Sequence, residues 1–558
     1  MISIVIILTL SIALAIPLGA WIKKVMCRDV SSISRQEDWI LSHLKIEDSP
    51  MSWKRYLRCV LMVSVTGFAL LYILLLADGQ SWDLAFNTAI SFVTNTNWQA
   101  ADPAFTLSWW VWAFGLVVQM FLSAAVGMSV VFALIRGFTH TQDGTVGNFW
   151  QDLTGSILYV LLPINVAAAL LLSACGTPMN LNGSQASALM DPVAVSEDGN
   201  LLYDIQIENG KVYQDGKEVP EARIANEQLV PGGLMAAVEA AKQTGTNGGG
   251  LTAANSASPF ENPSGWSNLI ENIQILLIPM ALCFSFGFMI RNKKQGMAIF
   301  LSMAVLFAIG LACCLGAEYS AANMLGKESR FGIGSSALWA VSTTAASSGS
   351  SNLSFNGMTP LGSLIPMILM QIGEVVFGGV GTGLIGMIGF VMLTVFIAGL
   401  MVGRTPEFLG KKIEPFEMKN SVILCICAPV CILAGSAIGC LFPAAGLGEG
   451  AHGFSQILYA WSSMGANNGS AMGGFATDTV LMNVLGGVLM ALGRFVPLAA
   501  ALAVAGSLGA KKITPVSAGT LATDTPLFSV LLVIIVLLIG ALSFFPALAL
   551  GPLAQFFG

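Results

Sequence analysis

Long apolar segments follow one another along almost the whole chain, and short polar or charged stretches separate them. A membrane-spanning helix needs roughly 20 consecutive apolar residues. The pattern therefore predicts an all-α polytopic membrane protein with ten transmembrane helices. The ten segments are 3–22, 57–77, 108–135, 156–174, 267–290, 296–316, 361–402, 419–442, 479–506 and 527–548.

Four shorter apolar stretches lie between these segments, and a small polar loop follows each of them. The stretches are 84–93, 232–243, 335–343 and 453–463, and the loops read TNTN, TGTN, AASS and GANN. Internal repeats indicate a repeated structural unit, here a helix, a half-helix, a pore loop and a second helix. We predict four pseudo-fourfold pore repeats, which are 57–136, 156–290, 296–403 and 419–507.

The rest of the chain lies outside this plan. Residues 1–56 are expected to form a transmembrane helix and a cytoplasmic loop, and residues 508–558 a final transmembrane helix. The second repeat also contains an excursion at about 175–231, where apolar and polar residues alternate around Asn209-Gly210. Alternation around an Asn-Gly pair is typical of a β-hairpin, so we expect a small periplasmic β insertion.

Lysine and arginine indicate which loops face the cytoplasm, because these residues accumulate on that side of a membrane. The loop at 23–58 holds eight of them, whereas the segments 78–107 and 443–478 hold none. With ten spans, both termini are expected on the periplasmic side. Among the remaining basic residues, we expect Arg404, Lys411 and Lys412 to contact phospholipid phosphates or a partner subunit.

The composition agrees with a large lipid-facing surface. Hydrophobic residues make up 55% of the chain and charged residues only 10%, whereas soluble domains carry about 25% charged residues. The formal net charge is −6, and the sequence contains no basic stripe. We therefore expect no nucleic-acid partner.

The four polar loops suit a dehydrated monovalent cation. Non-helical backbone at membrane depth persists only where protein surrounds it or a polar pathway passes, and rings of carbonyl groups replace an ion's hydration shell. Each preceding half-helix directs its partly negative C-terminus at the same place. The predicted filter comprises Thr94, Asn95, Thr96, Asn97, Gly245, Thr246, Asn247, Gly248, Ala346, Ser347, Ser348, Gly349, Ala466, Asn467, Asn468 and Gly469.

Other classes of ion fit these loops less well. An anion would need helix N-termini or arginine, a divalent cation would need carboxylates, and a soft metal would need cysteine or histidine. The loops offer none of these groups, although this reasoning alone does not separate K+ from Na+. A single loop could equally be a solvated periplasmic connection, but four at the same place in a repeat argue against that interpretation.

Four stretches around the loops resemble the potassium-binding subunit of bacterial Kdp K+-transporting ATPases, within the superfamily of K+ transporters. The stretches are SFVTNTNWQ (91–99), QTGTNGGG (243–250), STTAASSGS (342–350) and SSMGANNGSAM (462–472), and the likeness covers essentially the whole chain. The resemblance implies an inner-membrane subunit that selects periplasmic K+, beside a P-type ATPase subunit and two small accessory membrane subunits. It also implies an intramembrane tunnel that delivers K+ to the ATPase subunit.

The first loop departs from the pattern of the other three. It has Asn97 and Trp98 where the others reach Gly248, Gly349 and Gly469. The filter is therefore not expected to be truly fourfold, and the coordinating atom of the first repeat is left open.

Glycines interrupt the seventh apolar segment, which is too long for one straight span. Gly378, Gly379, Gly381 and Gly383 lie in FGGVGTGLIG (377–386), and glycine weakens a helix interior. We expect an unwound segment beneath the filter, and the resemblance implies a constriction there that prevents straight-through flow. The alternative is close helix packing through small residues.

Polar side chains inside the apolar segments are candidates for function, because their burial is costly. Gln371 and Glu374 precede the glycine-rich stretch, and Arg494 lies in the ninth segment. Glu374 either attracts the ion beneath the filter or pairs with Arg494, and both interpretations stay open. Gln119, after the first loop, either lines the entrance or cavity or joins two helices by a hydrogen bond.

The chain carries no signature of nucleotide chemistry. It contains neither a Walker sequence nor an aspartate in a DKTG-like context, so we expect a non-catalytic subunit with K+ as its transported ion and no bound nucleotide. The main alternative is a stand-alone K+ channel or cotransporter of the same superfamily. The outer carboxylates Asp102, Glu318, Glu449 and Asp478 are expected to be solvated surface charges.

Overall fold

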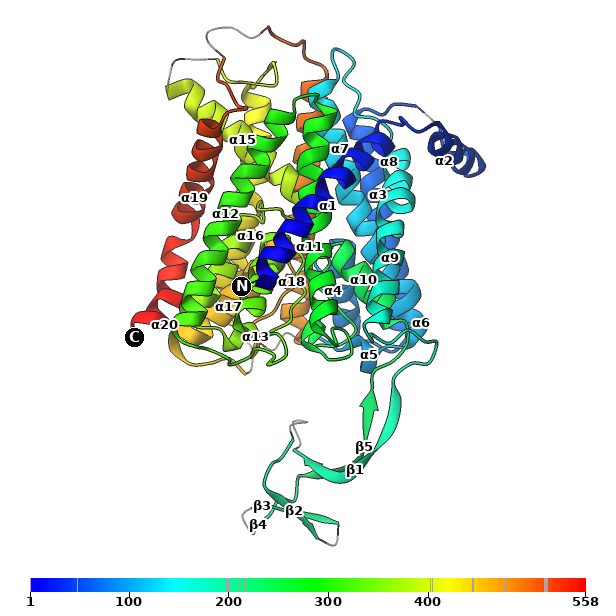
Figure 1. Ribbon diagram of the computed structural model, residues 1–558, viewed down its shortest axis with the longest axis vertical. Helices are drawn as coiled ribbons and strands as arrows, with labels where there is room; N and C mark the ends of the chain where they lie inside the picture. Colours follow the sequence, from blue (N-terminus) through cyan, green and yellow to red (C-terminus); the bar gives the residue numbers. More distant parts are fainter. Residues whose placement is uncertain are drawn as a thin grey trace.

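A computed structural model describes residues 2–47, 49–196, 201–208, 210–214, 217–401, 403, 405–443, 446–475, 478–515 and 520–558. In this part of the chain, ten helices are long and apolar enough to cross a membrane. The prediction of an all-α polytopic membrane protein is confirmed. Figure 1 shows the long helices packed side by side in one bundle, roughly along the long axis of the molecule.

Most of the ten helices begin and end within a few residues of the predicted apolar segments, and the seventh is the main exception. They are α1 (Ile2–Met26), α3 (Trp53–Ala77), Trp109–Thr139 ending in α7 (Val117–Thr139), Phe149–Ala174 comprising α8 (Phe149–Ser156) and α9 (Leu162–Ala174), α11 (Gly265–Met289), α12 (Lys293–Ser320), α15 (Thr382–Met401), α16 (Pro415–Leu441), α18 (Val480–Gly509), and Pro526–Phe557 beginning with α19 (Pro526–Leu548).

Four shorter helices end inside the bundle, each directly before one of the polar loops. They are α4 (Trp82–Val93), α10 (Met235–Thr244), α13 (Gly332–Ala345) and α17 (Gly450–Ala466). The Oγ of Ser81 accepts a hydrogen bond from the backbone N–H of Leu84 at 3.4 Å and so caps the start of α4. The C-terminal ends are buried, so the chain turns back within the protein and not in lipid.

The seventh predicted segment is divided into two helices. A short helix, α14 (Pro360–Gln371), precedes α15, and residues 372–381 between them are not helical. Gly373 and Gly381 have φ angles of 81° and 102° in this connection, a region that favours glycine because a Cβ atom is disfavoured there.

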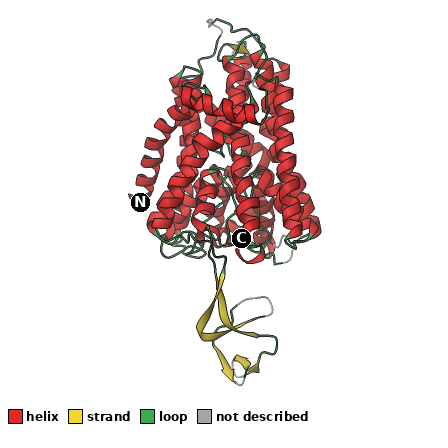
Figure 2. Ribbon diagram, turned by 90° about the vertical axis from the view of Figure 1, so that its right-hand side faces the viewer, coloured by secondary structure: helices red, strands yellow, loops and turns green. Residues whose placement is uncertain are grey.

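The excursion in the second repeat is a narrow β arm. Strand β1 (Gln185–Val195) pairs antiparallel with β5 (Arg223–Val230), while β2 (Ile205–Glu208), β3 (Lys211–Gln214) and β4 (Lys217–Glu218) form a small sheet at its tip. Glu208 pairs with Lys211 across the turn that contains Gly210; Asn209, the other half of the predicted turn, lies outside the described residues. Figures 1 and 2 show the arm projecting from one end of the helical body.

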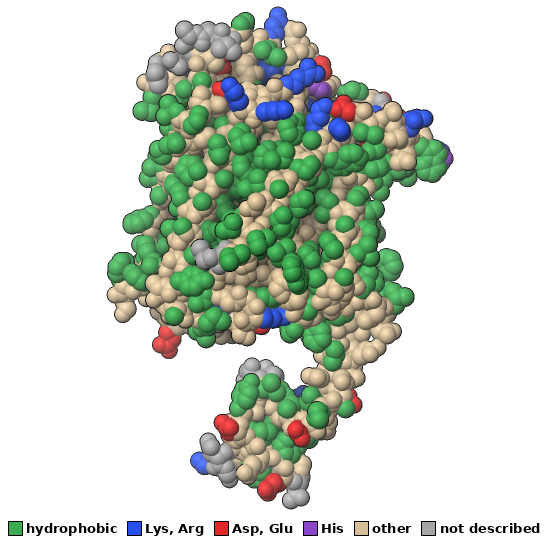
Figure 3. All heavy atoms as spheres, in the orientation of Figure 1, with side chains coloured by type: hydrophobic (Ala, Val, Ile, Leu, Met, Phe, Trp, Pro, Cys, Tyr) green, Lys and Arg blue, Asp and Glu red, His purple; other side chains and the backbone are tan. Residues whose placement is uncertain are grey.

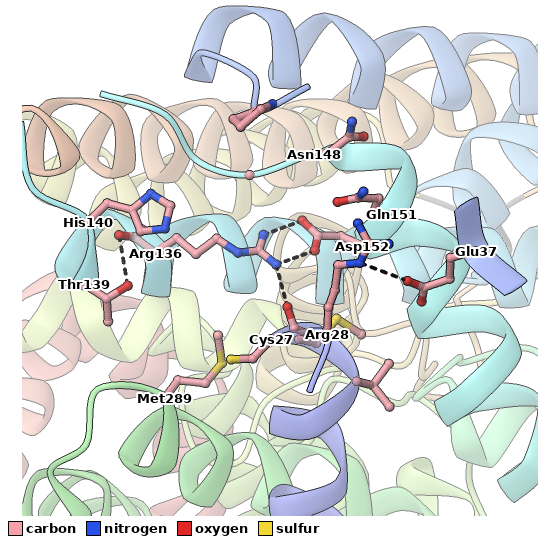
Figure 4. Close-up of a pocket in the computed structure, with 14 residues that line it drawn as sticks. Cys27, Arg28, Glu37, Arg136, Thr139, His140, Asn148, Gln151, Asp152 and Met289 are labelled. Atoms are coloured by element: carbon pink, nitrogen blue, oxygen red, sulfur yellow. Dashed lines mark hydrogen bonds and ion pairs between the residues drawn. The ribbon is translucent and has the colours of Figure 1, made fainter. Parts of the chain in front are cut away.

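Basic side chains gather at the opposite end of the body. Figure 3 shows most of the visible Lys and Arg side chains there, and we call this the basic end. The amphipathic helix α2 (Ser31–His43) lies at the basic end and contributes Glu37 to a pocket of about 350 Å³. In the same pocket both terminal nitrogens of Arg136 donate to the carboxylate of Asp152 at 2.6 Å, which ties α7 to α8 (Figure 4).

The expectation that Lys411 contacts lipid or a partner was wrong. Lys411 lies in a two-strand hairpin of β6 (Glu407–Phe408) and β7 (Lys411–Lys412) and is buried. Its Nζ donates to three backbone carbonyls, those of His140 at 2.6 Å, Leu508 at 2.9 Å and Lys511 at 2.8 Å. The ammonium thus satisfies carbonyl groups at the ends of α7 and α18, which helix ends leave without partners. Lys412 is exposed, and Arg404 lies outside the described residues.

Glu318 is also not the solvated charge that the sequence predicts. Its side chain is buried at the end of α12, where its Oε2 lies 2.6 Å from the Nζ of the equally buried Lys327. The other oxygen accepts hydrogen bonds from the backbone N–H and the hydroxyl of Thr359, at 2.9 and 2.8 Å. The pair therefore fixes the start of α14 to the end of α12.

Candidate functional site

The four polar loops meet in the interior of the bundle. We define them by the predicted filter residues as loop 1 (94–97), loop 2 (245–248), loop 3 (346–349) and loop 4 (466–469), so loops 2 to 4 begin one residue after the stretches TGTN, AASS and GANN. All sixteen residues are buried except Ala466 and Gly469, which are half-buried. The structure thus brings together every residue of the predicted filter, although these residues are up to 375 positions apart along the chain, between Thr94 and Gly469.

Side-chain hydrogen bonds join loops 1, 2 and 3. The Nδ2 of Asn95 donates to the carbonyl oxygen of Thr246 at 2.9 Å and connects loop 1 with loop 2. The hydroxyl of Ser348 donates to the carbonyl oxygen of Asn247 at 3.4 Å and connects loop 3 with loop 2. Each contact joins loops that follow one another along the chain.

Loop 4 completes the circle. The hydroxyl of Ser347 in loop 3 donates to the carbonyl oxygen of Asn467 at 3.2 Å. The Nδ2 of Asn467 in turn donates to Oγ1 of Thr96 in loop 1 at 2.9 Å. The contacts therefore run from loop 1 through loops 2, 3 and 4 and back to loop 1, so the loops form a closed ring.

The backbone of the ring repeats as well. The second residue of every loop has a left-handed conformation, with φ of 66° at Asn95, 47° at Thr246, 51° at Ser347 and 63° at Asn467. Non-glycine residues in this region cost roughly 1 kcal/mol or more each. Four such residues at equivalent positions indicate that the same turn is built four times, and such a turn changes the direction of successive carbonyl groups.

Glycines allow the backbones of the ring to approach one another. A Cβ atom added to Gly248 would lie 2.5 Å from the carbonyl oxygen of Thr96 and 2.7 Å from that of Asn468. A Cβ atom added to Gly349 would lie 2.8 Å from the Cα of Gly248. Real Cβ atoms do not come so close to backbone, so a side chain at either glycine would separate the loops.

Asn97 takes the position of these glycines in loop 1. Both polar atoms of its side chain are buried, and neither has a hydrogen-bond partner among the described residues. Buried polar groups normally find a partner, so the Asn97 amide is available to a ligand. A cavity of about 520 Å³ opens beside it on the arm side of the ring, lined by Asn97, Gly248, Gly349 and Gly469.

The break between α14 and α15 lies against loops 2 and 3. The backbone N–H of Gly379 donates to the carbonyl oxygen of Ala346 at 2.7 Å, and that of Val380 donates to Oγ1 of Thr246 at 3.0 Å. Two further glycines, Gly378 and Gly383, are packed directly on each other where the chain turns into α15. The unwound backbone therefore supports the ring from one side.

Glu374 belongs to this break and contacts loop 4. Its Oε1 accepts a hydrogen bond from the Nδ2 of Asn468 at 2.6 Å. Arg494 lines the same cavity of about 60 Å³, but its Nη2 donates to the carbonyl oxygen of Ser123 at 3.0 Å. Although Glu374 and Arg494 are both described, the structure shows no ion pair between them.

Gln119 and Gln371 form hydrogen bonds between helices. The Nε2 of Gln119 donates to the carbonyl oxygen of Gly67 at 3.3 Å and joins α7 to α3. The Nε2 of Gln371 donates to the hydroxyl of Ser462 at 3.1 Å and joins α14 to α17. Of the two interpretations for Gln119, the structure therefore shows the contact between helices.

Sequence reasoning missed the polar groups behind loop 2. Lys242, Glu239 and Glu261 are buried there, and Asn255 contacts the loop itself. The available signal was the pair of opposite charges at positions 239 and 242, one helical turn apart inside a half-helix. Charges in a half-helix that is enclosed by protein must be paired, so this spacing indicates a buried ion pair.

Comparison with known proteins gives concordant results. The family model described as "Potassium-transporting ATPase A subunit" matches residues 5–557. Relatives named potassium-transporting ATPase potassium-binding subunit include one from Clostridium perfringens and one from Desulfovibrio desulfuricans. Each is 47% identical and is aligned over 98% of this chain and 97% of the relative.

A solved structure shares the fold. The crystal structure of the potassium transporter TrkH from Vibrio parahaemolyticus superposes with a TM-score of 0.52 over 80% of this chain and 84% of that chain. The sequences are only 14% identical, so the similarity concerns the arrangement of the helices.

Proposed function

Because the chain belongs to the family of potassium-transporting ATPase A subunits, we propose that it binds periplasmic K+ in the four-loop ring and passes the ion on within an ATP-driven uptake complex. The relatives are named as the potassium-binding subunit of an ATPase, and this name implies a second subunit that hydrolyses ATP. In this division of labour the chain itself selects and conducts the ion, and the energy comes from the partner.

The closed ring of hydrogen bonds carries this proposal. A filter must hold its carbonyl groups at fixed distances, because they replace the water that the ion loses. The contacts from Asn95 through Thr246, Ser348, Ser347 and Asn467 to Thr96 provide such a frame. The side-chain amide of Asn97 has no hydrogen-bond partner among the described residues, which supports an ion-binding role for loop 1. The other three loops have glycine at this position.

The half-helices add a favourable field. Helices α4, α10, α13 and α17 all end at the ring, and a helix C-terminus carries a partial negative charge. Four such ends directed at one place favour a cation over an anion. No carboxylate belongs to the ring itself, which agrees with a monovalent rather than a divalent ion.

We propose that Glu374 and the glycine-rich break act on the ion after it has left the ring. Glu374 would attract the ion once it has passed loop 4, and the glycine-rich break at 378–383 would prevent flow straight through the bundle. The small cavity that contains Glu374 and Arg494 also reaches Leu424 in α16 and Pro497 in α18. This direction supports a lateral exit toward the ATPase subunit through the membrane.

The charge distribution supports an orientation. The basic end would face the cytoplasm of a bacterial inner membrane, because positive charge accumulates there. The arm, both termini and the cavity of about 520 Å³ beside Asn97, which we call the outer cavity, would then be periplasmic. Two small accessory membrane subunits and phospholipid would complete the assembly, with no nucleotide on this subunit.

Purification of the complex from membranes tests the function. We expect a P-type ATPase subunit to copurify, and its ATP hydrolysis to be stimulated by micromolar K+. In a complex that carries Gly248→Asp, ATP hydrolysis should require far more K+, because a carboxylate would fill the space between loops 1, 2 and 4. K+ flux through the isolated subunit, with no ATPase partner, would instead support the channel alternative.

A further inference from the structure

A buried ammonium group lies directly behind loop 2. The side chain of Lys242 in α10 is 0% exposed, and its Nζ lies 2.6 Å from Oε2 of Glu239 and 2.8 Å from Oε2 of Glu261. Glu271 of α11 is also buried and accepts a hydrogen bond from Gln243 at 3.1 Å. This charged cluster is enclosed by protein and belongs to the wall around the filter.

The ammonium reaches the filter through one amide. The Nζ of Lys242 donates to Oδ1 of Asn255 at 2.7 Å. The Nδ2 of Asn255 donates to the carbonyl oxygen of Gly248 at 2.9 Å. Asn255 also lines the outer cavity together with Gly349. Two consecutive hydrogen bonds therefore connect a buried charge to a filter carbonyl.

Lys242 and two backbone N–H groups together determine which end of the Asn255 amide faces the filter. An ammonium group only donates hydrogen bonds, so the amide oxygen must point toward it. The backbone N–H groups of Ser256 and Ser351 donate to the same oxygen, at 2.9 and 3.3 Å. With these donors on the oxygen side, the amide hydrogens are directed at Gly248. Ser351 follows loop 3, so the amide also connects loop 3 to loop 2.

We propose that Lys242 is a positioning residue for ion recognition, which acts through Asn255 to fix the direction of the Gly248 carbonyl. The inference rests on the proposed function of the ring as a K+ filter. The positive charge polarises the amide and strengthens its bond to Gly248, as in other charge-assisted chains. A carbonyl oxygen has two lone pairs, so the Gly248 oxygen accepts this bond and still has one lone pair for an ion.

Replacing the ammonium tests this relationship. In Lys242→Met the oxygen of the Asn255 amide keeps its backbone donors at Ser256 and Ser351 but loses its charged donor, so the amide is less polarised and holds the Gly248 carbonyl less firmly. We expect the KM for K+ uptake by the full complex to rise about tenfold, equivalent to about 1.4 kcal/mol. The maximal rate at saturating K+ should stay near that of the wild type, since the pathway behind the ring is unchanged.

A double-mutant cycle separates positioning from a general structural role. If Lys242 acts through Asn255, the KM of Lys242→Met/Asn255→Ala should equal that of Asn255→Ala alone. Independent structural effects would instead multiply. An unchanged KM in Lys242→Met, or multiplied effects in the double variant, would overturn the proposal.

Two further variants keep the test decisive if Lys242→Met does not accumulate in membranes. Lys242→Met/Glu239→Gln removes one positive and one negative charge and so preserves the formal charge of the cluster. Asn255→Asp keeps an acceptor for Lys242 but turns a second oxygen toward Gly248, so its KM should also rise. A wild-type KM in Asn255→Asp would contradict the proposal. A wild-type complex without K+-dependent uptake would contradict the filter function itself.

Discussion

Asn468 donates a hydrogen bond of 2.6 Å from Nδ2 to Oε1 of Glu374 and so connects loop 4 to the break between α14 and α15. The same amide nitrogen also donates to the carbonyl oxygen of Thr343 at 3.0 Å. The second carboxylate oxygen of Glu374 is buried and has no hydrogen-bond partner among the described residues. One oxygen therefore belongs to the frame of the filter, and the other is available to a passing cation.

Neutralising this carboxylate should slow transport. Glu374→Gln keeps an oxygen for Asn468 but removes the negative charge. We expect K+ uptake at low K+ to fall at least about tenfold, equivalent to about 1.4 kcal/mol, as measured in cells that depend on the complex. Glu449→Gln is the matched control, because Glu449 is exposed at the start of α17. Equal uptake by the two variants would contradict a role for the Glu374 charge.

A single methyl group at loop 2 should weaken ion binding. In Gly248→Ala the new Cβ would lie 2.5 Å from the carbonyl oxygen of Thr96, so loops 1 and 2 must separate. We expect a KM for K+ at least about tenfold higher, because core overpacking typically costs about 1–3 kcal/mol.

Gly316→Ala is the control for Gly248→Ala, because it adds the same methyl group where there is room for it. No atom lies within 4 Å of a Cβ added to Gly316, and neither Gly316 nor Gly248 has a positive φ. K+ uptake by this variant should match the wild type. A normal KM in Gly248→Ala would show that the loops are not packed as tightly as the ring requires.

Removing the Lys411 ammonium should destabilise the basic end. Lys411→Met leaves the carbonyls of His140, Leu508 and Lys511 without their common donor. At roughly 1 kcal/mol for each lost bond, the free energy of unfolding should fall by about 3 kcal/mol, seen as a lower Tm in detergent. Lys412→Met, one residue along and exposed, should leave Tm unchanged. Similar Tm values for both variants would argue against a stabilising role for the three hydrogen bonds of the Lys411 ammonium.

The attachment of α2 should depend on pH. Burial raises the pKa of Glu37 from 4.5 to about 7, although Arg28 nearby partly lowers it. Because the packed state binds the proton more tightly than the detached state, the attachment is strongest below pH 4.5 and weakens as pH rises toward 7. Hydrogen exchange in residues 31–43, corrected for intrinsic rates, should therefore be slower at acidic pH. Glu37→Gln should abolish this difference, and faster exchange at acidic pH would refute the linkage.

The long helices could be predicted from the sequence because lipid imposes a simple requirement on it. Each span needs about 20 apolar residues, and segments such as 57–77 and 527–548 differ by only a few residues from α3 and α19. The polar loops could be located for the same reason, since they interrupt an apolar background. The residue types in these loops then indicate which kind of ion they can bind.

The conformation of the ring and its support could not be predicted. Asn favours the left-handed conformation seen at Asn95, but Thr246 and Ser347 adopt it without any local preference, because the ring imposes it. Lys411 and Lys242 resemble solvated lysines in the sequence. Their partners, such as His140 and Glu261, become visible only when distant parts of the chain are packed together.

The β arm begins and ends at neighbouring points. Gln185 pairs with Val230 at its base, and Val195 with Arg223 further along. A short linker could therefore replace residues 186–229 without pulling the bundle apart, and a rigid foreign domain grafted at the same place would stand clear of the lipid. The arm thus offers an attachment point for a marker in imaging the assembled complex.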